Sequence, residues 1–315
     1  MPDGAGGLGK RILIAAPRGW CAGVERAVDI VERALQRHGP PVYVRKQIVH
    51  NLHVVRDLEA KGAIFVESEN EVPPDSVCVL SAHGVAPEVY QNARQRRLKL
   101  IDATCPLVTK VHVEARRFAK KGKTIFLIGH EGHEEVIGTS GQAPDRTVVV
   151  ERPEDVSKIE VSDPDNVAFI SQTTLAVDDT LDVVNALKQK FPGISAPTKD
   201  DICYASQNRQ SAVKQIARMA DLLLVVGSKN SSNSNRLVEV AREEGIESYL
   251  VEDESGIDPA WIDSAEVIGI SSGASTPEVL VERVVAHLAQ KGIVGVEEVR
   301  VATEGVHFPL PASVS

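Results

Sequence analysis

Residues 99–110 read KLIDATCPLVTK, and they carry the pattern from which the rest of the chain can be understood. A short apolar run ends in this stretch, and Cys105 stands at its tip. Thr104 suits a helix-capping position and Pro106 a first helical position, so a helix is expected to begin here. A strand that gives way to a helix at Cys105 would aim the thiol and several backbone N–H groups at one place.

Cysteines recur in the same setting at Cys21 and Cys203. Cys105 follows Cys21 by 84 residues, and Cys203 follows Cys105 by 98 residues. Apolar, strand-like runs alternate with segments of helical periodicity along the chain, which is typical of parallel α/β layers. The spacing of the cysteines therefore indicates an internal repeat of α/β units.

Further polar loops keep a similar spacing. One set holds His50, His133 and Ser231, at separations of 83 and 98 residues. Another set holds His83, Thr173 and Ser275, at separations of 90 and 102 residues. Because ligands of open parallel sheets bind beyond the carboxyl ends of the strands, three similar modules would direct these loops toward a shared centre.

The repeat also predicts how the chain is divided. The expected parts are a flexible N-terminal tail at 1–10, module 1 at 11–101, module 2 at 102–198, module 3 at 199–293, and a C-terminal tail at 294–315 that packs back on the body. Each module contains one of the three repeated cysteines under this division.

Composition narrows the classes of function. The chain has 315 residues, of which 43% are hydrophobic and 25% charged, as in ordinary globular proteins. Its formal net charge of -9 argues against nucleic acid and anionic membranes as partners. No apolar run approaches the length of a membrane span, and the Gly-rich start lacks the apolar core of a signal peptide. The expected location is the cytoplasm.

The four cysteines divide into two kinds. Cys78 lies inside an apolar run and is expected to be a buried core residue. Cys21, Cys105 and Cys203 each stand at the mouth of a polar loop, and this repeated placement favours metal ligation. Three thiolates leave one coordination position open, and soft thiolates suit either zinc or an iron–sulfur cluster. A cluster with three cysteine ligands would leave one iron free to meet a substrate.

Other loop residues point to an anionic ligand. His50, His83 and His133 can donate hydrogen bonds, and their near-equivalent positions suggest one shared ligand. The run at 231–233, Ser-Ser-Asn, follows an apolar strand and precedes a helix, as in many phosphate cradles. Neither a P-loop nor a well-placed dinucleotide fingerprint occurs, so nucleotide triphosphatase and nicotinamide dehydrogenase functions are not supported.

Glu135 follows His133 in the same loop and could shuttle protons near a metal and a diphosphate. Thr173 could relay a proton or orient this acid. The alternative is that Glu135 is an exposed acid beside Glu134, and spacing alone does not decide between these roles.

Taken together, the motifs resemble the 4-hydroxy-3-methylbut-2-enyl diphosphate reductase family, iron–sulfur enzymes that complete the non-mevalonate isoprenoid pathway. The resemblance covers nearly the whole chain. Two departures are Trp20, where the family usually has Phe, and Glu134, where Pro is common. The motifs are, in order, PRGWCAGV, SAHGV, DATCPLV, GHEGH, SQTTL, DICYA and GSKNSSNSNRL.

The resemblance implies a fold and a site. The fold would be an α/β trefoil of three modules with pseudo-threefold symmetry around a central [4Fe–4S] cluster. The cluster would be held by Cys21, Cys105 and Cys203, with its fourth iron open to the substrate hydroxyl. Glu135 would supply protons, with Thr173 and His133 beside it. The diphosphate would be bound by His50, His83, His133, Thr173, Ser231, Ser232, Asn233 and Ser275.

The implied reaction removes the hydroxyl group of the allylic diphosphate as water, with two electrons and two protons, and gives isopentenyl and dimethylallyl diphosphates. Electrons would come from reduced ferredoxin or flavodoxin. Two other interpretations remain: an iron–sulfur dehydratase or condensing enzyme such as quinolinate synthase, and a zinc-stabilised binding protein. The first would need carboxylate-binding residues, and the second would be colourless after anaerobic purification.

Overall fold

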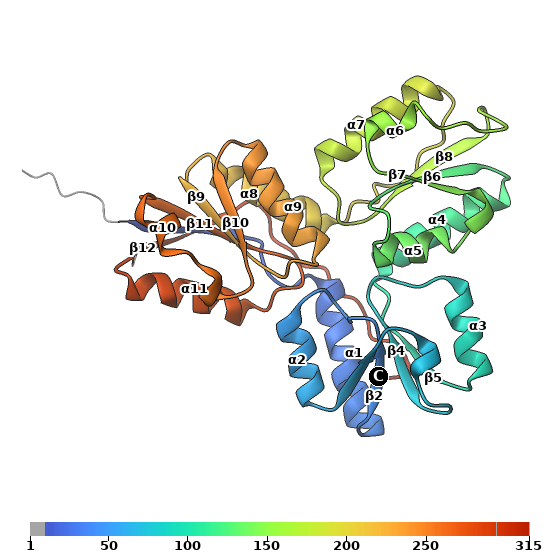
Figure 1. Ribbon diagram of the computed structural model, residues 1–315, viewed down its shortest axis with the longest axis horizontal. Helices are drawn as coiled ribbons and strands as arrows, with labels where there is room; N and C mark the ends of the chain where they lie inside the picture. The colour runs from blue at the N-terminus through green and yellow to red at the C-terminus, as the bar shows by residue number, and fades with distance from the viewer. Residues whose placement is uncertain (1–9, 294, 315) are drawn as a thin grey trace, which may run out of the picture. The chain divides into compact units, whose positions relative to one another are not determined.

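The computed structural model of the protein describes residues 10–293 and 295–314 (Figure 1). The expected N-terminal tail therefore lies, apart from Lys10, outside the described residues. The chain divides into two compact units. Unit 1 combines residues up to Cys21 with Tyr204–Gly305, and unit 2 combines Ala22–Cys203 with the residues from Val306 onward.

Unit 1 is built on one parallel sheet with the strand order β10-β9-β11-β1-β12. Alternate residues of β9 enter different cores: Leu222 and Leu224 pack on one face of the sheet, and Leu223 and Val225 on the other. A strand that is buried on both faces reads as an unbroken apolar run, as this one does. Its strands are β1 (Arg11–Ala16), β9 (Leu222–Val226), β10 (Glu247–Val251), β11 (Val267–Ser272) and β12 (Gly295–Arg300), and its helices are α8 (Tyr204–Ala217), α9 (Ser232–Glu243), α10 (Pro259–Asp263) and α11 (Glu278–Gln290).

The first strand belongs to a different sheet from the other strands of its expected module. β1 pairs with β11 on one side and with β12 on the other, so it belongs to the sheet formed by the last third of the chain. The blue strand among orange and red ones in Figure 1 shows this arrangement. Residues 11–16 therefore lie in a different sheet from the other strands of the expected module at 11–101. A buried apolar strand can pair with strands that are distant in the sequence, because its partners are selected by the fit of side chains on its two faces.

Unit 2 contains two parallel sheets, ordered β3-β2-β4-β5 and β7-β6-β8. The first sheet ends with β5, which is the apolar run that leads to Cys105. The strands are β2 (Val42–Arg45), β3 (Ala63–Val66), β4 (Val77–Leu80), β5 (Lys99–Asp102), β6 (Thr124–Ile128), β7 (Thr147–Val150) and β8 (Val167–Ser171). The helices are α1 (Ala22–His38), α2 (Leu52–Ala60), α3 (Pro87–Gln95), α4 (Pro106–Lys120), α5 (Glu134–Ser140), α6 (Pro153–Val156) and α7 (Val177–Lys190).

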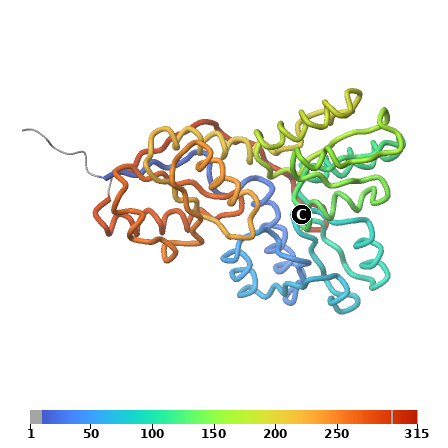
Figure 2. Tube along the Cα trace, turned by 45° about the horizontal axis from the view of Figure 1, so that its top comes forward, coloured from blue at the N-terminus to red at the C-terminus, as the bar shows by residue number. Residues whose placement is uncertain are grey.

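The segment expected to be a C-terminal tail begins with a strand. Residues 295–300 form β12, which pairs with β1 along its whole length. Farther on, Val314 joins the core between α1 and the first sheet of unit 2, and Leu310 packs against that core. Figure 2 shows the red end of the chain within unit 2, among its blue and green segments.

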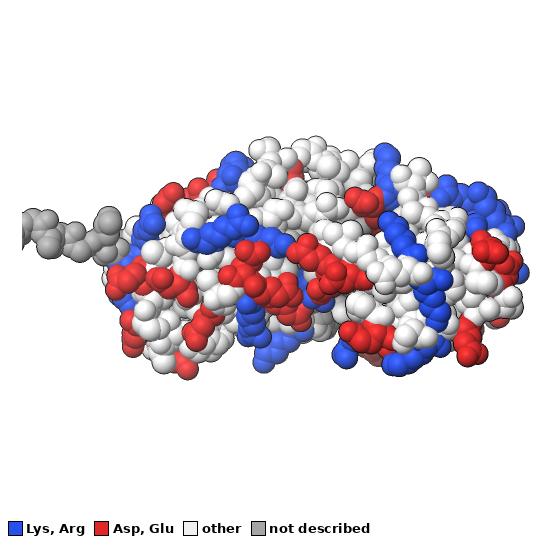
Figure 3. All heavy atoms as spheres, turned by 90° about the horizontal axis from the view of Figure 1, so that it is seen from above, with Lys and Arg blue, Asp and Glu red and all other residues white. Residues whose placement is uncertain are grey.

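The expectation of parallel α/β modules is confirmed, because every paired strand in the described residues runs parallel to its neighbour. The placement of the modules in a trefoil around one site stays a prediction. No helix within residues 10–293 and 295–314 is both long and apolar enough to cross a bilayer. Basic and acidic side chains are interspersed over the face shown in Figure 3.

Candidate functional site

Three histidines from different loops meet in unit 2. His50 follows β2, His83 follows β4, and His133 follows β6 as the N-cap residue of α5. The rings of His50 and His83 stack with centroids 4.0 Å apart. The ring of His133 stands edge-on to both, with its centroid 5.5 Å from His50 and 6.0 Å from His83. The structure therefore brings together the histidines that the sequence predicted to share a ligand.

Burial keeps these rings neutral at neutral pH. It lowers the pKa of His50 and of His133 to about 4, and it lowers that of His83 well below its usual value. His133 Nδ1 accepts the Glu135 backbone N–H at 3.2 Å, so the proton of the neutral ring is on Nε2. The buried Nδ1 of His83 has no hydrogen-bond partner within the described part of the chain. An anion with several oxygens would supply the acceptors that such a cluster calls for.

Close backbone contact holds two of these histidine loops together. Gly84, beside His83, has φ of +77°, a conformation that suits glycine. A Cβ added at Gly138 of α5 would lie 3.0 Å from the Gly84 carbonyl oxygen. On its other side, Gly84 packs against His112 of α4, a residue that no sequence motif marked. Glycine at 84 and 138 therefore lets the His83 loop approach the helix that carries His133.

Glu135 is not the exposed acid that one interpretation allowed; it is 2% exposed. Its carboxylate accepts the Thr173 backbone N–H at 2.6 Å and the Thr173 hydroxyl at 3.0 Å. Burial raises the pKa of Glu135 to about 7, although both bonds from Thr173 oppose that rise. An acid whose pKa lies near the working pH can both give and recover a proton.

Thr173 also connects this acid to a cysteine. The Thr173 carbonyl accepts the Cys203 backbone N–H at 3.0 Å. Asp201, two residues before Cys203, is buried and accepts the Ser171 N–H at 2.9 Å. Its charge adds to the rise in the pKa of Glu135. Asp201 was not among the predicted site residues, and only its place two residues before a predicted ligand marks it in the sequence.

Cys105 stands where the sequence placed it, between β5 and α4. Cys105 itself occupies the N-cap position, not Thr104, and Pro106 is the first helical residue. The Cys105 N–H donates to the Ala82 carbonyl at 3.0 Å, and Ala82 precedes His83. Three cysteines are partly exposed and outside any disulfide: Cys21, Cys105 and Cys203. Cys78 is buried, as expected. Burial raises the pKa of the Cys78 thiol to about 12, so it is inert at neutral pH.

The predicted anion cradle lies in unit 1, at the start of α9. Ser231 caps this helix by accepting the Ser234 N–H, and Ser232 is the first helical residue. The amide oxygen of Asn233 accepts the Ala274 N–H at 2.9 Å, which ties the cradle to the loop that holds Ser275. The cradle is therefore a helix N-terminus bound to the neighbouring strand-end loop.

Cys21 shares this part of unit 1. Its backbone N–H donates to the Ala274 carbonyl at 3.2 Å, so it too is bound to the loop of Ser275. The backbone N–H of each predicted ligand thus donates to a loop that directly follows a strand. The acceptors Ala274, Ala82 and Thr173 follow β11, β4 and β8. In residues 10–293 and 295–314, no group of three His, Cys, Asp or Glu is arranged to hold a metal ion. Cys21 belongs to unit 1 and the other two cysteines to unit 2, and a shared cluster stays a prediction.

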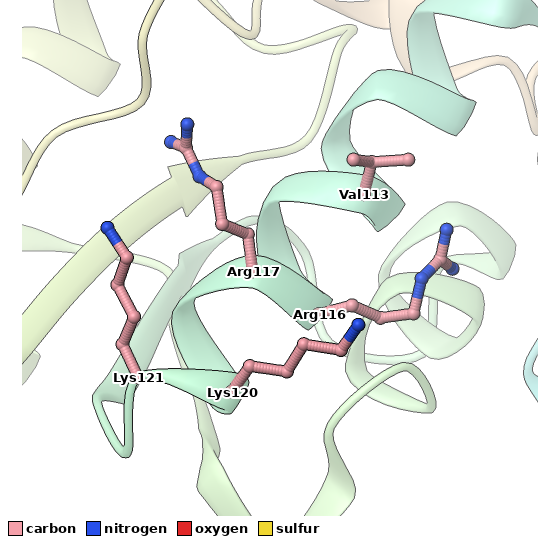
Figure 4. A pocket seen from close by; sticks show the side chains of 5 residues that line it. All are labelled: Val113, Arg116, Arg117, Lys120 and Lys121. Carbon is pink, nitrogen blue, oxygen red and sulfur yellow. The ribbon is translucent and has the colours of Figure 1, made fainter.

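A separate concave region lies on α4. It contains none of the predicted site residues, and its lining is mainly cationic (Figure 4). The lining residues are Val113, Arg116, Arg117, Lys120 and Lys121.

The parallel sheets define an α/β protein, and its candidate site combines a cluster of three buried histidines with a buried acid whose pKa is raised to about 7. The chain belongs to the LytB protein family, whose sequence profile matches residues 12–289.

Named relatives are similar over almost the entire chain. The 4-hydroxy-3-methylbut-2-enyl diphosphate reductase of Acidothermus cellulolyticus is 62% identical over 303 residues, which cover 96% of this chain and 89% of the relative. The enzyme of the same name from Tropheryma whipplei is 57% identical and is covered to 97% of its length. Among solved structures, the E-1-hydroxy-2-methyl-but-2-enyl-4-diphosphate reductase from Plasmodium falciparum matches with a TM-score of 0.94, 39% identity and coverage of 97% of both chains.

Proposed function

We propose that this protein is an oxidoreductase of the non-mevalonate isoprenoid pathway, which reduces (E)-4-hydroxy-3-methylbut-2-enyl diphosphate. Two electrons and two protons remove the allylic hydroxyl as water and give isopentenyl and dimethylallyl diphosphates. The observation that carries the chemistry is Glu135, a buried acid with a pKa raised to about 7 beside the histidine cluster. The family and the names of its members support the same reaction.

The donor set fits an iron–sulfur cluster. Cys21, Cys105 and Cys203 are part-exposed thiols outside any disulfide, and each lies in the residue before a helix. Helix N-termini stabilise negative charge, which suits thiolate ligands. We assign these three cysteines as ligands of a [4Fe–4S] cluster with one iron left for the substrate. When bound, the cluster would supply the electrons and a Lewis acid for the departing oxygen.

The chain's own residues bind the diphosphate and move protons. His50, His83 and His133 donate hydrogen bonds to the diphosphate from unit 2, and Ser231, Ser232, Asn233 and Ser275 form its second set of donors. Neutral donors that are fixed before the substrate arrives avoid the cost of reorganisation during the reaction. A diphosphate next to the rings would also raise their pKa and strengthen the bonds.

Glu135 is the proton donor in this proposal, and Thr173 fixes its orientation. The two bonds from Thr173 hold both carboxylate oxygens of Glu135. At neutral pH a part of the population carries the proton, and this fraction is ready to protonate the leaving hydroxyl or the allylic product.

The test is anaerobic turnover of the allylic hydroxy-diphosphate with a strong chemical reductant, for wild type and Glu135→Gln. Wild type should form both diphosphate products, whereas Glu135→Gln should keep the cluster spectrum and lose nearly all turnover. Full turnover by Glu135→Gln would remove the proposed proton donor. A colourless wild-type protein that contains zinc and no sulfide would contradict the whole assignment.

The electron donor is proposed to be reduced ferredoxin or flavodoxin, in the cytoplasm. The cationic region on α4 is a candidate docking surface, because an acidic carrier would be attracted to Arg116, Lys120 and Lys121. Replacement of Lys120 and Lys121 by Glu should raise KM for the carrier and reduce its dependence on salt, while turnover with the chemical reductant stays unchanged. An unchanged KM would exclude this surface.

A further inference from the structure

Each predicted cluster ligand is followed at once by a helix, and each of these helices carries one cation at a similar distance from the cysteine. The helices α1, α4 and α8 begin at the residues after Cys21, Cys105 and Cys203. Their cations Arg26, Lys110 and Arg209 follow these cysteines by five, five and six residues. The side chains of all three bind backbone carbonyls just before a different cysteine.

The first cation is Arg26, on the helix after Cys21. Its guanidinium donates to the carbonyls of Ala103 and Thr104, at 3.3 and 3.2 Å. These are the two residues directly before Cys105. Burial lowers the pKa of Arg26, and the nearby charge of Cys105 opposes that effect. Arg26 therefore lies close to the second cysteine as well as to the backbone that presents it.

The second cation is Lys110, on the helix after the second cysteine. Its ammonium donates to the carbonyls of Lys199 and Asp200 at 2.6 and 2.7 Å. It also pairs with the buried carboxylate of Asp201 at 3.0 Å. These acceptors lie two to four residues before Cys203. All three donors of the ammonium are thus directed at the segment that leads to the third cysteine.

The third cation is Arg209, on the helix after the third cysteine. Its side chain is completely buried, and it donates to the Gly19 carbonyl at 2.7 Å and to the Arg18 carbonyl at 3.4 Å. Glu304 balances its charge at 3.0 Å. The carbonyls lie two and three residues before Cys21, so the series returns to the first cysteine.

We propose that Arg26, Lys110 and Arg209 are positioning residues of the iron–sulfur site, each holding the loop that presents the next cysteine in the series. None of these contacts crosses between the two units: those of Arg26 and Lys110 lie within unit 2, and that of Arg209 lies within unit 1. Each cysteine loop is then fixed twice: its preceding carbonyls bind a cation, and its own N–H binds the carbonyl of Ala274, Ala82 or Thr173. Charge-assisted bonds to carbonyls are strong and directional, and they set the direction in which each thiolate points.

The inference rests on the proposed function, because it assumes that the three cysteines hold a cluster. The variants are Arg26→Met and Lys110→Met, with Arg26→Lys and Lys110→Arg as cation-keeping partners. Arg209 is too deeply buried to replace without risk to the fold. Matched controls are Arg33→Met on α1 and Lys120→Met on α4, which replace exposed cations on the same helices.

The measurement is the rate at which the reconstituted holoprotein releases iron to a chelator under anaerobic conditions. The cluster's visible and EPR spectra and the unfolding midpoint of the metal-free protein are recorded beside it. The Met variants should release iron about 10- to 100-fold faster than wild type, as for other residues that orient metal ligands. Their metal-free unfolding midpoints should stay near wild type, the cation-keeping variants should recover most of the retention, and the controls should match wild type.

Met variants that release iron at the wild-type rate would overturn the inference. So would variants whose cluster loss follows an equal loss of metal-free stability and is not recovered by the retained cation, since that marks a general structural role. A wild-type protein that takes up no iron and sulfide would instead refute the proposed function, so the two failures are distinguishable.

Discussion

Replacement of Glu135 by Gln should make the metal-free protein more stable at alkaline pH and change its stability little at acidic pH. The folded protein holds the pKa of Glu135 at about 7, against 4.5 for an unperturbed glutamate. Below pH 4.5 the carboxyl is protonated in both the folded and the unfolded chain. As the pH rises, the unfolded chain releases this proton first, so the unfolding free energy falls until the pH passes the folded pKa.

The size of the effect follows from these two pKa values. A rise from 4.5 to about 7 corresponds to roughly 3 kcal/mol of unfolding free energy. Most of that difference develops between about pH 5 and about pH 8, where we expect about 2 to 3 kcal/mol. Gln cannot ionise, so the variant lacks this contribution. The buried histidines contribute the same pH dependence to both proteins, and their contribution cancels in the comparison.

Urea denaturation of both metal-free proteins, at about pH 5 and about pH 8, measures the change. Glu131→Gln is the control, because this glutamate is exposed in the same loop. Infrared difference spectroscopy should also detect a protonated carboxyl near neutral pH in wild type and not in Glu135→Gln. A stability difference that is the same at both pH values would refute the claim that burial raises the pKa of Glu135.

Other variants test the remaining contacts. Cys105→Ser should lose the cluster and turnover, and a full complement of iron and sulfide in that variant would contradict its assignment as a ligand. Gly138→Ala should raise KM for the diphosphate substrate more than it lowers kcat, because the new Cβ lies 3.0 Å from the Gly84 carbonyl; steady-state kinetics with unchanged KM would show that the loop yields without cost. Thr173→Val removes a hydroxyl bond that lowers the pKa of Glu135, so the alkaline limb of the pH–rate profile should move up by roughly half to one unit. A limb that stays in place, or moves down, would argue against Glu135 as the titrating donor.

The sequence carried enough information to predict the strands and the polar loops at their ends. Apolar runs such as 222–226 are long and unbroken enough to be recognised as buried strands from the sequence alone. Within one parallel sheet the strands deliver their following loops to the same edge, so His50 and His83, which follow neighbouring strands, could be expected to meet. His133 follows a strand of another sheet, and only the repeat of polar loops along the chain predicted it beside them. The structure confirms that meeting for the histidines.

Strand partners and backbone contacts were beyond the sequence pattern. Nothing in residues 11–16 indicates that they pair with strands near the other end of the chain. Residues 295–300 contain only two apolar side chains, Val296 and Val299, on either side of two glutamates, and they were expected to be a tail. The bonds of Arg26, Lys110 and Arg209 go largely to main-chain carbonyls, which every residue has, and so no side-chain motif marks their acceptors.

The position of β1 between β11 and β12 has a consequence for biosynthesis. The ribosome makes Arg11–Ala16 more than 200 residues before either of its two partner strands, β11 and β12. Residues 22–203 can close both sheets of their own unit during that time, whereas this apolar hexapeptide must wait, exposed to chaperones and to neighbouring nascent chains.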